Sequence, residues 1–212
     1  MPSLHVIAGC NGSGKSTFAK SFLPNNIQSF DFDKVELQYY NQMQDSELRS
    51  LIAKNKAIKH FGNAISIAID TKSDFCYETN FDTYPIDIPT QFKENGYEIN
   101  IIFFCIDNQG IARHRIQVRT ENNGHFVNNE TIDFKWKAGY KNINKYYMFF
   151  DKILIVDNSI NNSVYTNILQ VVDNKVEMLS KYLPNYFQRR FPDIYKMVKQ
   201  IDNKIINHRL SD

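Results

Sequence analysis

The sequence predicts an α/β fold: a three-layer sandwich in which helices cover both faces of a mainly parallel sheet. Two observations support this prediction. Short apolar runs alternate with longer stretches of helical periodicity, as expected of strand–helix–strand units. A glycine-rich segment, residues 9–17, separates the first apolar run from the first helical stretch. With 212 residues, 42% hydrophobic and 23% charged, the chain is expected to form a single domain over 1–212.

The short apolar runs are predicted to be buried strands, because helices cover both faces of a parallel sheet. These runs span residues 4–8, 75–77, 99–106 and 153–156. A further segment, 30–35, alternates apolar and acidic residues.

Helices are predicted where apolar residues recur every three or four positions. The polar segment 121–131 lacks this periodicity and is expected to be the loop of a helical lid. A C-terminal helical extension is expected over 185–212. The predicted helices span 15–23, 46–69, a stretch ending at Asn95, 111–120, 131–147, 164–179 and 193–207.

Charge and cysteine content narrow the classes of partner and compartment. A formal net charge of +2 makes a nucleic-acid partner unexpected, because no global positive field is present. Cys10, Cys76 and Cys105 have neither metal-ligand spacing nor an evident pairing, which favours a reducing, cytoplasmic setting, and Cys10 is expected to fill space. No apolar run approaches the roughly 20 residues of a membrane helix, so no membrane association is expected.

The glycine-rich segment matches the phosphate-loop pattern G-x-x-x-x-G-K-[ST]. Its glycines allow the backbone to point N–H groups at phosphate oxygens, and the following helix adds its positive N-terminus. Lys15 is expected to reach the β- and γ-phosphates, and the Ser16 hydroxyl to bind Mg²⁺. The motif therefore predicts a P-loop NTPase fold that binds ATP or GTP with Mg²⁺. The predicted nucleotide-binding residues are Gly9, Asn11, Gly12, Ser13, Gly14, Lys15, Ser16 and Thr17.

Phosphoryl transfer to a hydroxyl also needs a carboxylate near the acceptor oxygen. Asp33 is the first candidate, because it follows the first helix at the sheet edge that faces the ligand in such folds. Asp31 is its competitor, since the two would share a side of an extended segment. The alternative is that one of the two simply caps a helix before Lys34. Glu78 ends a predicted strand, where it could assist Mg²⁺ or bind a substrate hydroxyl; otherwise it is a solvated strand-end acid.

Positive charge over the transferred group is expected from the helix that precedes the lid. Arg115 and Arg119 lie four residues apart and share a face, whereas Arg113 lies off that face and is expected to be solvated. Arg119, nearest the lid, is the predicted catalytic arginine. The alternative is an ordinary basic helix surface. His125 within the lid is expected to order the lid or contact phosphate.

Several motifs, in order and at suitable spacing, resemble those of zeta-toxin-like kinases, a subfamily of P-loop kinases. The loop string 8–18 resembles the loop of that family, and Glu78-Thr79 resembles its acidic-Thr pair. Further resemblances are Arg115 with Arg119, then Gly124-His125-Phe126-Val127, then Ile132, and finally Asp157-Asn158-Ser159. Asn123, Asn128 and Lys135 depart from the family pattern, which puts the lid chemistry and the substrate in question.

The resemblance implies a kinase that phosphorylates a hydroxyl of a small metabolite, such as a UDP-N-acetylhexosamine. It maps the acceptor-activating aspartate onto Asp33 and implies substrate contacts from Glu78, Thr79, Arg115 and His125. Members of this family include bacterial toxins, so an antitoxin protein is an implied partner. Two rivals stay open: a nucleoside or polynucleotide kinase, and a nucleotide-hydrolysing switch or ATPase. Against an ATPase, Asp107 follows the apolar run 99–106 by one residue rather than ending a clear Walker B strand.

Overall fold

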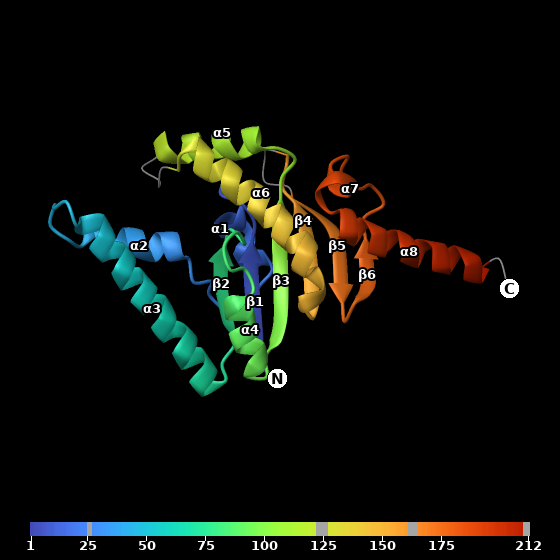
Figure 1. The fold of residues 1–212 in the computed structure, drawn as a ribbon, viewed down its shortest axis with the longest axis horizontal. Helices are drawn as coiled ribbons and strands as arrows, with labels where there is room; N and C mark the ends of the chain where they lie inside the picture. Colours follow the sequence, from blue (N-terminus) through green and yellow to red (C-terminus); the bar gives the residue numbers. More distant parts are fainter. Residues whose placement is uncertain (25–26, 122–126, 161–164, 210–212) are drawn as a thin grey trace.

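The computed structural model describes residues 1–24, 27–121, 127–160 and 165–209, with side chains up to residue 200. Six strands form one sheet in the order β2-β1-β3-β4-β5-β6 (Figure 1). The first four in this order are parallel neighbours, and β5 and β6 are antiparallel additions at one edge. The strands are β1 (Ser3–Ala8), β2 (Phe75–Thr79), β3 (Glu98–Cys105), β4 (Lys152–Asp157), β5 (Thr166–Val172) and β6 (Lys175–Leu179).

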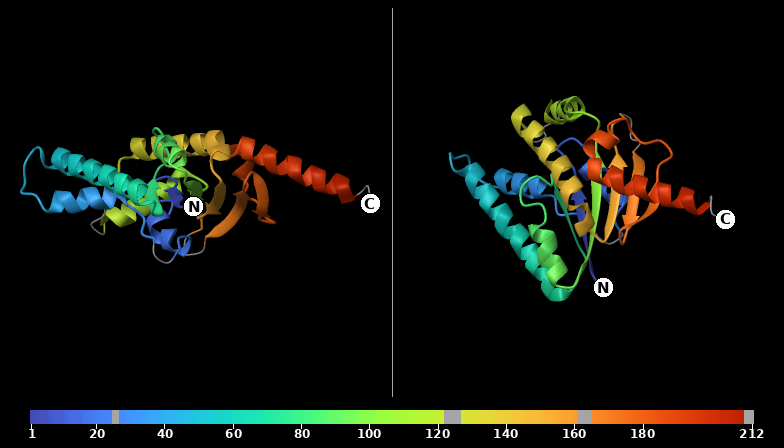
Figure 2. Two further views of the ribbon diagram at one scale, coloured as in Figure 1. Left: turned by 90° about the horizontal axis from the view of Figure 1, so that it is seen from below. Right: turned by 45° about the vertical axis from the view of Figure 1, so that its right-hand side comes forward.

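Helices cover both faces of the sheet, which confirms the predicted three-layer α/β fold. Figure 2 shows α1 and α6 on opposite sides of the sheet, and α2 and α3 as a pair that extends from the body. The helices are α1 (Lys15–Phe18), α2 (Phe32–Asn41), α3 (Arg49–Thr71), α4 (Asp87–Glu94), α5 (Gln109–Glu121), α6 (Asn129–Tyr146), α7 (Phe187–Arg190) and α8 (Pro192–Arg209). Short 3₁₀ turns, Ala19–Ser21 and Tyr147–Phe149, continue α1 and α6.

The two faces of the sheet bury separate apolar clusters. Alternation along β1 sends Leu4, Val6 and Ala8 into the larger cluster, which also contains residues of α3, α4, α6, α7 and α8. Ile7 points into the smaller cluster on the other face, which also contains Ala19 and against which Phe18 of α1 packs. Strands β1 and β3 are buried along nearly their whole length, as predicted from their continuous apolar runs.

The helix predicted over 164–179 is wrong: residues 166–179 form the β5–β6 hairpin. Its turn places Asp173 and Asn174 at positive φ, 47° and 61°, as in tight hairpin turns. Ile168 is an extra residue in β5, because the pairing with β4 shifts register between Ile155 and Val156. Such a bulge breaks the two-residue alternation of a strand, so the buried positions acquire a spacing of three and four.

Segment 30–35 is not extended beyond its first residue, so the condition under which Asp31 and Asp33 would share a side is not met. Phe30 alone bridges to β2, and helix α2 begins at Phe32. The Asp31 side chain caps this helix by accepting from the Lys34 N–H at 3.1 Å, so the capping alternative holds for Asp31. Asp33 therefore lies in the first turn of a helix.

Residues 122–126 of the expected lid, His125 among them, lie outside the described residues. The two ends of the lid belong to helices, since α5 ends at Glu121 and α6 begins at Asn129. Among the described residues, no helix combines the length and the apolar content needed to cross a membrane. The expected C-terminal extension contains α7 and α8, whose first turns pack into the larger apolar cluster.

Candidate active site

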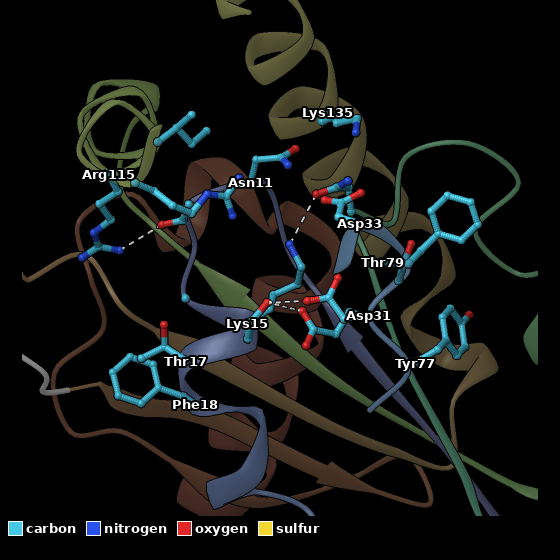
Figure 3. Close-up of a pocket in the computed structure, with 18 of the residues that line it drawn as sticks. Asn11, Lys15, Thr17, Phe18, Asp31, Asp33, Tyr77, Thr79, Arg115 and Lys135 are labelled. Carbon is cyan, nitrogen blue, oxygen red and sulfur yellow. Dashed lines mark hydrogen bonds between the residues drawn. The ribbon is translucent and has the colours of Figure 1, made fainter. Parts of the chain in front are cut away.

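A cleft of about 990 Å³ opens where the parallel strands end. The phosphate loop and α1 form its floor, the ends of β2 and α2 form one wall, and α5 and α6 form the other. Figure 3 shows Lys15 between Arg115 on one wall and Asp31 and Asp33 on the other. The glycine-rich loop between β1 and α1 therefore lies at an open cleft, together with residues from distant parts of the chain.

The loop backbone has the geometry that its glycines allow. Gly12 and Gly14 have φ values of 76° and 98°, a region that residues with a Cβ rarely adopt. A Cβ on Gly14 would overlap the amide nitrogen of Asn158. Helix α1 begins directly after Gly14, and no side chain caps its first turn. The N–H groups of this turn are thus free of a side-chain cap, as an anion site requires.

Lys15 is fixed by three acceptors at the centre of the cleft. Its Nζ donates to the carbonyls of Gly9 at 2.8 Å and Cys10 at 3.1 Å, and to Asn80 Oδ1 at 3.3 Å. Burial lowers the pKa of the Lys15 ammonium, while the neighbouring carboxylates of Glu78 and Asp33 raise it. The ammonium is therefore held at the floor of the cleft by residues that directly follow β1 and β2.

Three oxygen-bearing side chains meet beside Lys15. The Ser16 hydroxyl donates to Glu78 Oε2 at 2.6 Å and lies 3.4 Å from Asp31 Oδ2. Burial raises the pKa of Glu78, and the neighbouring charge of Asp31 raises it further. An all-oxygen group with excess negative charge fits Mg²⁺, which binds through one or two carboxylates plus phosphates. The described residues hold no cluster of three or more His, Cys, Asp or Glu side chains that could form a complete metal cage.

Asp33 lines the cleft from the exposed first turn of α2. Across the cleft, Lys135 projects from α6 and is half-buried. Both lie close enough to influence Lys15: Asp33 raises the pKa of its ammonium and Lys135 lowers it. A carboxylate and a cation thus occupy the end of the cleft beyond the phosphate loop.

The arginines of α5 have three different environments. Arg115 donates to the Gly12 carbonyl at 3.2 Å and to the Ile160 carbonyl at 3.4 Å, so it contacts the phosphate loop directly. Arg119 is exposed and lines the cleft. Arg113 forms an ion pair with Asp133 of α6 at 2.6 Å, half-exposed rather than fully solvated as expected.

The remaining expected site residues divide into two groups. Asn11 and Thr17 line the cleft, whereas the buried loop residues Gly9 and Ser13 do not. Thr79 also lines the cleft, where its Oγ1 accepts from the Phe81 N–H at 3.0 Å and shapes the turn after β2.

Two buried or half-buried amides support the loop: Asn80, which the sequence suggested only as a weak substrate contact, and Asn158, which received no role. Asn80 accepts from Lys15, and its only sequence signal is its place after Glu78-Thr79. Asn158 is 4% exposed and donates to the Ser13 carbonyl at 2.8 Å. The signal for Asn158 was the strand-end triplet 157–159. Lys54 of α3 lines the cleft without any signal, because no local pattern relates it to the loop.

A phosphate loop between β1 and α1, with acidic and basic walls around its lysine, places this chain in the class of P-loop kinase folds. Residues 1–170 match the family described as Zeta toxin. The chain belongs to the Zeta toxin family, as the resemblance of its motifs implied. An uncharacterized protein of Haemophilus influenzae is 30% identical over 129 residues, which cover 60% of this chain and 88% of that protein.

Three solved structures share the fold at low sequence identity. A structure from the PezAT chromosomal toxin–antitoxin system of Streptococcus pneumoniae is 16% identical, with a TM-score of 0.60 over 100% of this chain and 88% of that chain. An AvrRxo1 complex with ATP is 12% identical, with a TM-score of 0.61 over 84% and 60%. An RNA repair complex is 19% identical, with a TM-score of 0.53 over 68% and 46%, so this chain spans under half of that one.

Proposed function

We propose that this protein is a kinase that transfers the γ-phosphoryl group of ATP or GTP to a hydroxyl of a small metabolite. The observation that supports this proposal most directly is that one cleft contains Lys15, the Ser16–Glu78–Asp31 group and Asp33. Family membership supports this proposal. Within it, a UDP-N-acetylhexosamine is the first acceptor to test, and an antitoxin protein is a proposed partner. Three free, buried cysteines suit a reducing cytoplasm.

The donor nucleotide would lie over the phosphate loop. Its phosphates would accept from the backbone N–H groups of Gly12–Thr17, with Lys15 turned toward the β- and γ-phosphates. Ser16, Glu78 and Asp31 would hold Mg²⁺, since they offer the oxygen ligands that it prefers. When bound there, Mg²⁺ would neutralise charge on the phosphate oxygens.

The acceptor would enter at the opposite end, between α2 and α6. Asp33 would take the proton from its hydroxyl as that oxygen forms a bond to the γ-phosphorus. The bond from the γ-phosphorus to the oxygen that bridges it to the β-phosphate would break, and ADP or GDP would leave with those electrons. Arg119 and Lys15 would stabilise the negative charge on the moving group, with Arg115 and the lid residue His125 assisting.

Phosphorus NMR of the protein with Mg-ATP and separate UDP-sugars, nucleosides and short oligonucleotides tests the proposal. A new phosphomonoester signal with one acceptor, absent in Lys15→Ala, is the expected result and identifies the acceptor class. A signal with nucleosides or oligonucleotides alone would replace the metabolite by that rival acceptor. Release of ADP and phosphate at a rate that no acceptor changes would refute transfer and favour an ATPase or switch.

The roles of Asp31, which caps α2, and Asp33, in its first turn, can be separated by how each variant depends on Mg²⁺. Asp33→Asn should slow transfer at least about a hundredfold without changing the Mg²⁺ concentration at half-maximal rate. Asp31→Asn should raise that Mg²⁺ concentration. Asp45→Asn, at a 93% exposed side chain, is the matched control and should behave as wild type. Normal turnover in Asp33→Asn would remove Asp33 from its assigned role.

A further inference from the structure

A buried tyrosine of the C-terminal segment reaches the strand end behind the phosphate loop. Tyr186 is 4% exposed, and its hydroxyl donates to Asp157 Oδ1 at 2.7 Å. The Sγ of Cys105 lies 3.3 Å from the same hydroxyl. Burial raises the pKa of the Tyr186 phenol far above its ordinary value, so it keeps its proton and acts as a donor. Asp157, the last residue of β4, is thus hydrogen-bonded to a residue that lies outside residues 1–170, the part of the chain that matches the family.

Asp157 in turn fixes the turn that contains Asn158. Its Oδ1 accepts from the Ser159 N–H at 3.0 Å and from the Ser159 hydroxyl. The backbone N–H of Asn158 donates to the Cys105 carbonyl at 2.9 Å. Since its backbone is held on both sides, the Asn158 side chain has a defined direction toward the loop, where it donates to the Ser13 carbonyl at 2.8 Å.

The C-terminal segment is itself firmly packed. Phe187 and Phe191 are 1% and 0% exposed, and the Phe191 ring lies against Tyr140 with centroids 5.3 Å apart. The Arg190 guanidinium lies 4.0 Å from the centre of the Trp136 ring of α6. Tyr186 therefore directly precedes a tightly packed helix, α7, and this packing holds its hydroxyl against Asp157.

We propose that Tyr186 and Asn158 are positioning residues for nucleotide binding. The carbonyl and N–H of a trans peptide point in opposite directions. An amide held on the Ser13 carbonyl therefore fixes where the Gly14 N–H points, which is toward the phosphate site. Tyr186 acts one step further back, by holding Asp157 and the turn that orients Asn158. This inference rests on the proposed binding of a nucleotide by the loop.

Calorimetric titration with a non-hydrolysable ATP analogue and Mg²⁺ measures the effect. Tyr186→Phe should weaken binding about three- to tenfold, less than the full worth of a hydrogen bond to a charged group, because the lost bond does not touch the nucleotide. Asn158→Asp replaces the donor by an acceptor that faces the Ser13 carbonyl, and should weaken binding more than about tenfold. The order of the two effects follows from their distance to the loop.

Tyr97→Phe is the matched control for lost stability. The Tyr97 side chain is 3% exposed, and its hydroxyl donates to the Ala68 carbonyl at 2.6 Å, so the change also removes a buried hydrogen bond. Tyr97 follows α4 at the opposite end of the strands from the loop. Its variant should lose thermal stability and keep the affinity of wild type within about twofold.

Amide hydrogen exchange of residues 10–17 gives a readout that does not depend on a ligand. Exchange in this segment should be faster in Tyr186→Phe than in wild type and unchanged in Tyr97→Phe. Wild-type affinity together with wild-type exchange in Tyr186→Phe would overturn the inference. If the wild-type protein binds no nucleotide, the proposed function fails. The exchange rate of residues 10–17 in Tyr186→Phe still decides the inference in that case: faster exchange supports it and unchanged exchange overturns it.

Discussion

The loop backbone makes a quantitative prediction at Gly14. Its φ of 98° is a conformation that costs a residue with a Cβ about 1–3 kcal/mol. A Cβ would also displace the Asn158 amide, whose bond to the Ser13 carbonyl is worth about 0.5–1.5 kcal/mol. Together these losses lower the free energy of unfolding of Gly14→Ala by about 1.5 to 4.5 kcal/mol. Nucleotide binding should be lost, because the same peptide carries an N–H of the phosphate site.

Circular dichroism during heating and titration with a nucleotide analogue measure both effects. For a chain of this size the expected fall in Tm is about 3 to 18 °C. Gly62→Ala is the matched control, since Gly62 lies within α3 with nothing within 4 Å of an added Cβ. That variant should gain about 0.5–1 kcal/mol from helix propensity. A Gly14→Ala protein with wild-type Tm and affinity would refute the reasoning from backbone geometry.

Three further predictions concern charge and packing. Because the pKa of Glu78 is raised in the folded protein, the metal-free protein should lose stability as pH rises from about 4.3 through that raised value. Urea unfolding across this window should show the loss in wild type and its absence in Glu78→Gln. Arg190→Ala should cost about 1–2 kcal/mol and change the fluorescence of Trp136, the single tryptophan, whereas exposed Arg189→Ala should change neither. Leu169→Ala, at a fully buried β5 position, should cost about 2–5 kcal/mol in chemical denaturation; a cost under about 1 kcal/mol would contradict that burial.

The features predicted best from the sequence are those encoded locally. The pattern from Gly9 to Thr17 contains both the loop and the start of its helix, and the continuous apolar runs mark the central strands. Each of these signals lies within a few residues, where steric rules act directly. The parallel sheet and the position of Lys15 in a cleft followed from them.

The β5–β6 hairpin was missed because two bulges disturb its alternation. Ile168 and Glu177 are extra residues opposite β4 and β5, so Ile168 and Leu169 are both buried although adjacent. Pairing with a neighbouring strand decides this pattern, and the local sequence does not contain it. The signal that was available is the Asp173-Asn174 turn, whose residue types tolerate positive φ.

The supporting residues of the site could not be predicted, because they meet the loop only in three dimensions. Asn158 and Tyr186 carry ordinary polar groups, and nothing local in the sequence relates either of them to Ser13. Asp31 and Asp33 were recognised as a pair, but assigning them separate positions required knowing where α2 begins. Long-range contacts of this kind depend on the whole topology.

The contact between Asn158 and Ser13 also affects how the protein is made. Its partners are separated by 145 residues of chain. At a synthesis rate of about 5–20 residues per second, Ser13 leaves the peptidyl-transferase centre roughly 7 to 30 s before Asn158 is added. During this interval the nascent loop lacks the amide that orders it, and Phe187 and Phe191, which complete the apolar cluster, are added later still. The ordered loop therefore cannot form before residue 158 has been added, and the apolar cluster behind it is not complete before residue 191 has been added.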